Sequence, residues 1–517
     1  MKHVIRISYQ NKISLEQIAS FACHAEVELI LDPDPHFRQS IALNHQFMLE
    51  SVASGWPIYG ATTGFGSSST SRLGSHEVAE LQKNLYRYHG CGVGPYLSPS
   101  ESAAVLIVRL NCLTYACSGI SFDLLDHLQG LARARMFPMI RSQGSVGASG
   151  DLTPLSYLAA VVAGERQVWW RGEVREAQDV YEHLGMRPYT FKAREALALM
   201  NGTSVMAALS GLAWLRVQQL VRWAQVSTAL MVELWQGPAA PFLAALHHVK
   251  PHAGQQKVAA AIQELLHEAP ERLLRRDAKD ARYEGSVQDP YSLRCVPQLL
   301  GAVQDVLDTT RIWIETEINS VNDNPVFLHE EKQVLNGGHF FGGHIAAACD
   351  ALKAGCANAL NLLDRQMALL LESRGRLPEN LVSSQQDAPY LHHGFKAMQI
   401  TISALAAEAT KLAAPMSVLS RPTEASNQDV VSMGTIAARD LLSLSRLAMD
   451  GVAIQCMALC QAFYILEEKG ERPPLNQGLE EILDQWKQVF PMQIKDRALD
   501  ADIQAMVSHL FGELAWS

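Results

Sequence analysis

Apolar residues recur at helical spacing through most of the second half of the chain. The four longest such stretches contain few glycines and cover residues 203–235, 345–373, 393–413 and 433–468. This spacing predicts long helices, and helices that are apolar on several sides pack as a bundle and often bury surface between subunits. We therefore expect a mainly α protein built on a long-helix bundle.

The first 200 residues follow a more broken pattern. Residues 3–8 and 26–31 predict short strands, and a short helix should start after Ser14. Further helices are expected at 36–55, 76–90 and 100–134, and hairpins at 166–175 and 325–337. No linker or repeat separates the two parts. We expect residues 1–200 to form a loop-rich N-terminal region and residues 201–517 a helical bundle domain that is continuous with it.

Composition narrows the function without naming it. Hydrophobic residues make up 48% of the 517 residues, charged residues 19%, and the net charge is −10, which gives no reason to expect nucleic acid or an anionic membrane as partner. Nine cysteines without a C-x-x-C pair indicate reduced thiols. The N-terminal residues show no h-region or cleavage site, so we expect no signal peptide, and Arg216 and Arg222 interrupt the best apolar span. We expect a soluble, cytoplasmic protein with no metal.

One glycine-rich stretch, residues 144–157, interrupts this pattern and contains Ser149. Glycines at 144, 147 and 150 allow a tight turn, and Asp151 then predicts the start of a helix. The hydrolase pattern G-x-S-x-G fails because Asp151 follows Gly150, and no G-K-[ST] follows to bind phosphate. Taken alone, a turn that caps a helix is the simplest interpretation.

The run from Ala148 to Leu152 also resembles the signature of the aromatic amino acid ammonia-lyase family. This family includes histidine, phenylalanine and tyrosine ammonia-lyases and related aminomutases. The resemblance implies that Ala148, Ser149 and Gly150 cyclise, with loss of two waters, to 4-methylidene-imidazol-5-one (MIO). It also implies a carbon–nitrogen lyase with the helical fumarase/aspartase-like fold, no dissociable cofactor, and a homotetramer with shared active sites.

Other motifs match the family in the same order along the chain. Residues 59–66 resemble the family motif Y-G-x-N-T-G-F-G, with Thr62 in place of Asn. Residues 201–203 match the family's N-G-T and residues 319–325 its N-S-x-x-D-N-P. The most specific match outside the turn is Gln-Asp-Pro-Tyr-Ser-Leu-Arg-Cys at residues 288–295. The resemblance implies that Tyr59 is the base and that Asn201 and Arg294 hold the substrate carboxylate. The remaining candidates are Gln288 and Tyr291 at the reacting centre, Asn324 and Phe340 lining the site, Glu408 at the ammonium, and Gln428.

Each of these residues also has a plain structural explanation. Tyr59 could anchor its loop, Asn201 could cap the long helix, Arg294 could form an ordinary ion pair, and Phe340 could belong to the core. A helical scaffold without chemistry is therefore the alternative to an enzyme. Ser149, Tyr59 and Arg294 are all present, which favours the enzyme.

Two segments bear on the substrate. Family members carry Ser-His, Phe-Leu or His-Leu at the positions of Tyr88 and His89, according to whether they act on histidine, phenylalanine or tyrosine. His89 matches the histidine lyases, whereas residues 427–429, Asn-Gln-Asp, match phenylalanine and tyrosine lyases. A hydroxylated ring reconciles both, so the sequence favours L-tyrosine, which would give a trans-cinnamate-type acid. The alternatives are histidine ammonia-lyase, which forms urocanate, and an aromatic 2,3-aminomutase.

Overall fold

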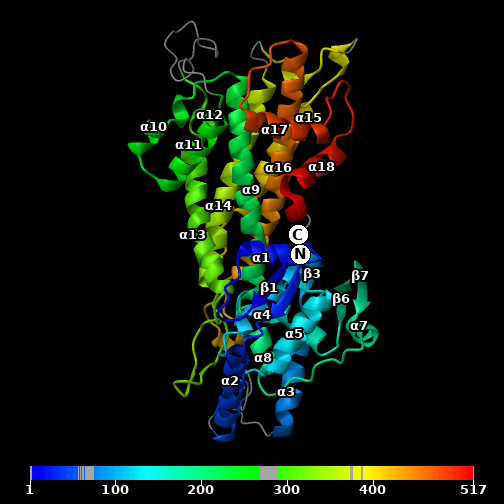
Figure 1. The fold of residues 1–517 in the computed structure, drawn as a ribbon, viewed down its shortest axis with the longest axis vertical. Coiled ribbons are helices and arrows are strands. Elements are labelled where there is room, and N and C mark those ends of the chain that lie inside the picture. The colour runs from blue at the N-terminus through cyan, green and yellow to red at the C-terminus, as the bar shows by residue number, and fades with distance from the viewer. Residues whose placement is uncertain are drawn as a thin grey trace.

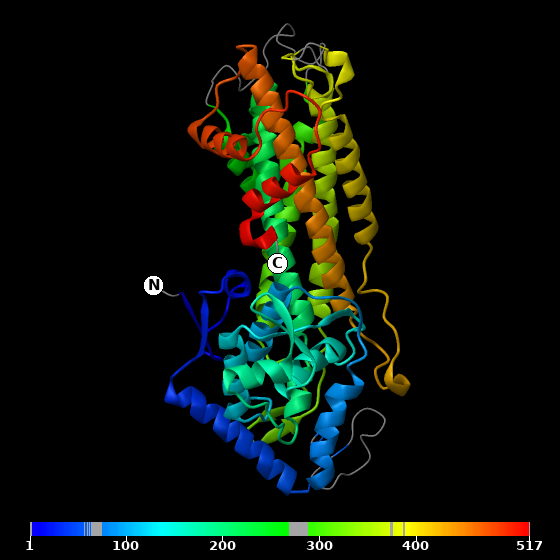
Figure 2. The ribbon, with the colours of Figure 1, turned by 90° about the vertical axis from the view of Figure 1, so that its right-hand side faces the viewer.

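Four long helices form the axis of the molecule. They are α9 (Ser204–Leu234), α13 (Val296–Ile318), α14 (Gly343–Leu371) and α16 (Gly434–Glu468), and α15 (Lys396–Leu412) lies beside α14 and α16. All run along the longest axis, above a body made from the N-terminal elements (Figures 1 and 2). This computed structural model describes residues 3–55, 57–58, 60, 63, 75–267, 288–372, 376–385 and 388–515.

The N-terminal body is a set of shorter elements around the same core. Its helices are α1 (Leu15–Cys23), α2 (Pro35–Ala53), α3 (Ser75–Tyr88), α4 (Pro99–Leu113), α5 (Phe122–Ala134), α6 (Leu152–Val162), α7 (Ala177–Leu184) and α8 (Glu195–Met200). Its strands are β1 (Val4–Ile7), β2 (Glu28–Leu31), β3 (Val93–Tyr96), β4 (Phe137–Pro138), β5 (Arg141–Gln143), β6 (Gln167–Trp170) and β7 (Glu173–Glu176). One hydrophobic cluster runs from Ile5 to Phe511 and joins both parts. A domain boundary at residue 200 stays a prediction.

The strands make small sheets. β1 pairs with β2 in parallel, β3 with β5 antiparallel, and β4, β6 and β7 form a three-stranded antiparallel sheet. The hairpin β8 (Val326–Leu328) and β9 (Gln333–Leu335) follows α13. Both predicted hairpins and the mainly α fold are thus confirmed. The upper end also carries α10 (Ala244–His248), α11 (Ala253–Leu265), α12 (Tyr291–Arg294), α17 (Gln477–Val489) and α18 (Asp500–Phe511).

The structure corrects two sequence predictions. The stretch 100–134 is two helices, because the chain turns between α4 and α5, where Ala116 and Gly119 have φ of 52° and 69°. The carboxamide of Asn44 on α2 accepts a hydrogen bond from the Gly119 nitrogen at 2.8 Å and stabilises this break. The second correction concerns the expectation that no apolar span is long enough to cross a membrane. By length and composition α16 is such a span, although 89% of its most apolar window is buried within the protein.

Candidate active site

The Ala148–Gly150 turn is tightly compressed. Gly147, Ser149 and Gly150 all have positive φ, at 83°, 50° and 74°, and the Gly150 nitrogen donates to the Gly147 carbonyl at 3.3 Å. A Cβ added to Gly150 would lie 2.1 Å from the Gly202 carbonyl oxygen, so only glycine fits there. A left-handed Ser149 is strained, and such strain is concentrated at functional sites. The three residues therefore fit the cyclisation that the resemblance implies.

The junction between α8 and α9 lies against this turn. The Asp151 nitrogen donates to the Gly202 carbonyl at 2.7 Å, and the Asn201 side-chain amide donates to the Ser149 carbonyl at 3.3 Å. Asn201 ends α8, while Thr203 is the residue that precedes α9, so the helix-cap alternative for Asn201 is wrong. Its amide donates to the turn, because the carboxylate of a different residue binds the start of α9.

That carboxylate is Asp151. It is fully buried and accepts hydrogen bonds from the Val205 and Met206 nitrogens, both at 2.9 Å, and from the Thr435 hydroxyl on α16. Burial raises the pKa of Asp151 to about 6, although these hydrogen bonds oppose the shift. Asp151 directly precedes α6, as predicted, but its side chain ties α9 and α16 to the turn.

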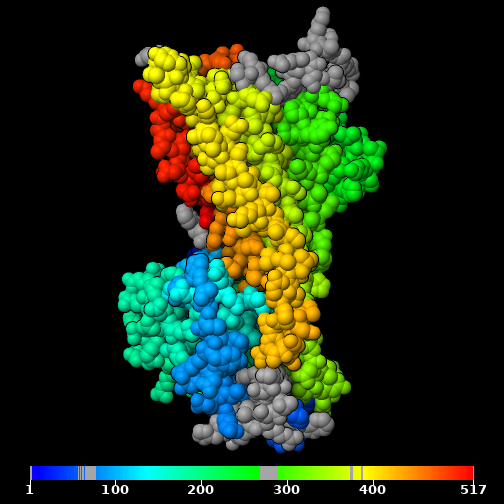
Figure 3. All heavy atoms as spheres, turned by 180° about the vertical axis from the view of Figure 1, so that it is seen from behind, coloured from blue at the N-terminus to red at the C-terminus, as the bar shows by residue number. Residues whose placement is uncertain are grey.

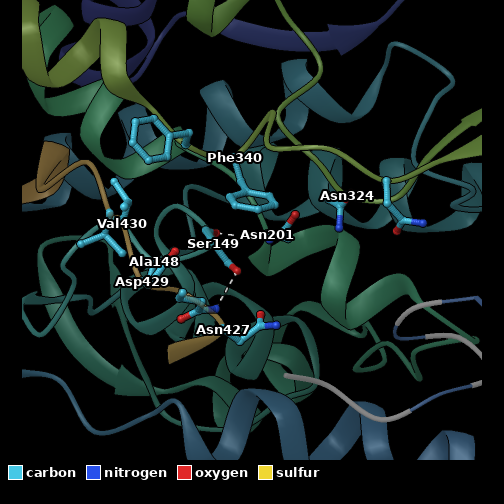
Figure 4. A pocket seen from close by; sticks show the side chains of 13 residues that line it. Ala148, Ser149, Asn201, Asn324, Phe340, Asn427, Asp429 and Val430 are labelled. Atoms are coloured by element: carbon cyan, nitrogen blue, oxygen red, sulfur yellow. Dashed lines mark hydrogen bonds between the residues drawn. The ribbon is translucent and has the colours of Figure 1, made fainter. Parts of the chain in front are cut away.

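A pocket of about 320 Å³ opens beside Ser149 (Figure 4). Its walls come from the turn, the α8–α9 junction, the segment after α13 and the segment before α16. The lining residues are Gly147, Ala148, Ser149, Asn201, Asn324, Asn336, Phe340, Phe341, Asn427, Gln428, Asp429, Val430 and Val431. Sequence reasoning missed Asn336 and Phe341, whose only signal was that they lie close along the chain to predicted site residues.

Three predicted residues point into this pocket from separate segments. The Gln428 amide donates to the Ser149 hydroxyl at 3.1 Å, and Phe340 lies over the same space, not in the core (Figure 4). The Asn324 side-chain oxygen accepts from the Gly337 nitrogen at 2.8 Å, which fixes the segment that carries Phe340. The segment between α15 and α16 runs down the outer surface onto the N-terminal body (Figure 3).

The carboxylate-binding group predicted at 288–295 lies elsewhere. α12 contacts the far end of α14, where the Gln366 amide donates to the Ser292 carbonyl at 2.9 Å. Gln366 lies about 35 Å along α14 from Gly343, the end that adjoins the pocket. Gln288, Tyr291 and Arg294 are therefore not brought to Ser149 within one chain. Tyr291 is 71% exposed.

Arg294 and Glu408 have other surroundings in one chain. The Arg294 Nε donates to the Asp289 carbonyl at 2.9 Å, and its guanidinium lies 4.5 Å from the centre of the Tyr291 ring. Glu408 is exposed on α15, so the expectation of a buried carboxylate there is not met in a single chain. Tyr59 lies outside the residues that the structure describes.

Tyr88 ends α3 and His89 follows it, near the loop that carries Gln428. Their ring centroids are 4.3 Å apart, and Tyr88 is 57% exposed. Burial lowers the pKa of His89 to about 4, which the charge of Glu424 partly opposes, so the imidazole is neutral at pH 7. Glu424 lies beside Thr423, which is bridged to Gln428. His89 thus borders the pocket region without lining the pocket itself.

Known proteins share this architecture. The family model described as aromatic amino acid lyase matches residues 13–488. Histidine ammonia-lyase from Myxococcus xanthus is 34% identical over 499 residues, which cover 96% of this chain and 94% of that protein. Histidine ammonia-lyase from Trypanosoma cruzi superposes with a TM-score of 0.88 at 28% identity, covering 99% of this chain and 95% of that one. Tyrosine aminomutase from Streptomyces globisporus does so with a TM-score of 0.89 at 31% identity, covering 98% and 97%.

Fold, turn and relatives together define a helical carbon–nitrogen lyase. The chain belongs to the aromatic amino acid lyase family. Members of this family use the MIO group.

Proposed function

We propose that this chain eliminates ammonia from an aromatic L-α-amino acid, and that L-histidine is its first candidate substrate. The observation that carries the reaction type is the compressed Ala148–Gly150 turn, which presents Ser149 to a pocket lined by amides and aromatic rings. The relatives support histidine, because those matching at 34–36% identity are named histidine ammonia-lyases. They support histidine better than the tyrosine preference drawn from the sequence.

Ala148, Ser149 and Gly150 would together become the MIO group. Once formed, MIO supplies an electrophile that accepts the substrate amine and makes it a better leaving group. Before cyclisation, the Asn201 amide donates to the Ser149 carbonyl and the Gln428 amide donates to the Ser149 hydroxyl, the group that would leave as the second water. Phe340 lines the pocket beside this turn. Tyr59 is proposed as the base that removes the β-proton.

The substrate carboxylate needs a cation, and the described residues that line the pocket include no lysine, arginine or histidine. Arg294 offers the planar fork suited to a carboxylate, yet it lies at the other end of the bundle, together with Gln288 and Tyr291. These three residues can reach a Ser149 pocket only from a second copy of the chain. We therefore propose a homotetramer with shared active sites, in the cytoplasm, in which Glu408 also faces a neighbouring copy's site and receives the substrate ammonium.

L-tyrosine is the second candidate, favoured by one contact. The side chain next to Ser149 is the neutral amide of Gln428, where histidine lyases usually carry an acidic pair followed by His. A neutral His89 can accept a hydrogen bond from a phenol hydroxyl. The likeness to tyrosine aminomutase also keeps a β-amino acid among the candidate products.

Two measurements test the proposal. Intact mass of the purified chain should be lower than the sequence mass by two water molecules, and Ser149→Ala should show the full mass and no turnover. Separate incubations with L-histidine, L-tyrosine and L-phenylalanine, followed by chromatography, then identify urocanate, 4-hydroxycinnamate, cinnamate or a β-amino acid. Urocanate supports the first candidate and 4-hydroxycinnamate the second. An unmodified Ser149 and no product from any of the three would refute the lyase assignment.

A further inference from the structure

The segment that carries Tyr88 and His89 runs along α6, the helix that starts directly after the Ala148–Gly150 turn. β3, which follows this segment, pairs with β5, which precedes the turn. The Tyr157 hydroxyl, in the middle of α6, donates to the Gly92 carbonyl at 3.4 Å. A Cβ added to Gly144 would lie 3.3 Å from the Gly92 Cα, which shows how closely the two backbones approach. The segment that carries Tyr88 and His89 and the Ala148–Gly150 turn are thus both positioned by β5 and α6.

Two residues just after the C-terminal end of α6 hold this segment on both sides of Tyr88 and His89. Before them, the Glu165 carboxylate accepts three hydrogen bonds from Arg87: Nη2 to Oε1 at 2.7 Å, and Nε to Oε2 at 3.1 Å and to Oε1 at 3.2 Å. It also accepts one from the Tyr86 hydroxyl at 3.1 Å. After them, the Arg166 Nη2 donates to the Gly90 carbonyl at 3.1 Å. We call Glu165 and Arg166 the α6 clamp.

The α6 clamp is itself fixed. The Glu165 nitrogen donates to the Ala160 carbonyl on α6 at 2.8 Å, and the Arg166 carbonyl accepts from the Ala177 nitrogen at the start of α7 at 2.7 Å. The Arg166 guanidinium lies 4.6 Å from the centre of the Tyr157 ring. The backbones of Glu165 and Arg166 and the Arg166 side chain are therefore fixed relative to α6. The position of residues 86–90 thus depends on the position of α6.

The charge state of the clamp suits this role. Burial would raise the pKa of Glu165, but the hydrogen bonds from Arg87 and Tyr86 outweigh it and lower the pKa. The pair with Arg87 is largely open to solvent, so water screens it and it adds little to the stability of the protein. Because the Arg87 guanidinium binds both Glu165 carboxylate oxygens, the pair nevertheless fixes the orientation of Arg87 relative to Glu165 as well as the distance between them. The clamp therefore acts on position more than on overall stability.

We propose that Glu165 and Arg166 are positioning residues that set where His89 meets the substrate ring, and so determine which ring the enzyme prefers. This inference rests on the proposed function, because it needs an aromatic substrate beside His89. A displacement of about 1 Å at a site that orients substrate can cost on the order of a hundredfold in rate. Loosening either side of the clamp should therefore change selectivity before it changes stability.

The test compares Arg166→Gln and Glu165→Gln with Arg141→Gln. Arg141 is a matched control because its Nη1 also donates to a glycine carbonyl, that of Gly94 at 2.7 Å, but Gly94 lies in β3, four residues further along the chain than Gly90. For each variant, kcat and KM are measured with L-histidine, L-tyrosine and L-phenylalanine. Hydrogen–deuterium exchange of residues 86–96 is followed in parallel on the intact protein. Arg166→Lys keeps the cation and should restore part of the preference.

We expect Arg166→Gln and Glu165→Gln to raise KM for the preferred amino acid about tenfold. The ratio of its kcat/KM to that of each of the other two amino acids should fall accordingly. Exchange should quicken at residues 87–91. In Arg141→Gln the preference should be unchanged, and faster exchange should be confined to the neighbourhood of Gly94. A preserved preference in both clamp variants, with or without faster exchange, would overturn the inference. If the wild-type chain converts no substrate, the proposed function fails, and unchanged exchange in the clamp variants would then refute the clamp separately.

Discussion

The buried ion pair behind Asn324 gives a prediction that can be worked out from the structure. Arg194 and Asp323 are both almost fully buried, and the Arg194 Nη2 lies 2.7 Å from an Asp323 carboxylate oxygen. Arg194 also donates to the carbonyls of Ser118, Asn324 and Pro325 at 2.7–3.2 Å. The other Asp323 oxygen accepts from the Asn324 nitrogen at 2.7 Å, which places the site-lining amide.

Asp323→Asn removes the negative charge that lies beside the buried Arg194 guanidinium. Removing one partner of a buried pair costs about 3–5 kcal/mol, a large part of the roughly 5–15 kcal/mol that stabilises a folded protein. Because the carboxamide that replaces the Asp323 carboxylate can still accept one hydrogen bond, we expect a loss of about 3 kcal/mol, at the lower end of this range. Turnover should fall as well, since Asn324 loses its fixed position.

Urea unfolding followed by fluorescence of the nine tryptophans measures the loss, at one protein concentration because association shifts apparent stability. The control is Asp126→Asn, whose partner Arg38 and own side chain are 60% and 52% exposed, and it should cost less than about 1 kcal/mol. Replacing both buried partners, in Arg194→Met with Asp323→Leu, should recover much of the loss. A loss in Asp323→Asn no larger than in Asp126→Asn would refute the reasoning.

Three further predictions concern the turn and the pocket. Gly150→Ala should prevent the loss of two waters, because its Cβ would lie 2.1 Å from the Gly202 carbonyl oxygen. In the control Gly172→Ala, at φ 80° with no atom within 4 Å, the two waters should still be lost. An intact mass lower by two waters in Gly150→Ala would contradict this. Because the pKa of His89 is about 4 in the folded chain against 6.5 in the unfolded chain, the unfolded chain binds more protons between these values, so stability falls as pH falls through this window. His89→Gln should remove up to about 3 kcal/mol of that fall, and equal slopes of unfolding free energy against pH would count against it. Gln428→Glu should raise kcat/KM for histidine relative to tyrosine about tenfold, because a charged acceptor binds an imidazole N–H more strongly, and an unchanged ratio would show that Gln428 does not face the ring.

The sequence by itself determined the local structure and the family. The apolar repeat at 203–235 became α9, Ser204–Leu234, and the hairpin at 166–175 became β6 and β7, because side-chain periodicity and turn residues act over a few positions. The Ala148–Gly150 turn was found for the same reason, since its glycines report a backbone requirement at their own positions. Tyr59 was predicted on equal grounds and stays a prediction.

Only the tertiary structure decided which distant groups meet. It placed the Asp151 carboxylate on α9 and α16, brought Gln428 to Ser149 across 279 positions of sequence, and left Arg294 at the opposite end of the bundle. No local pattern specifies these outcomes, because they depend on how long rigid helices pack side by side. Helix length sets the separation between Ser149 and Arg294, and a motif read along the chain contains no information about that distance.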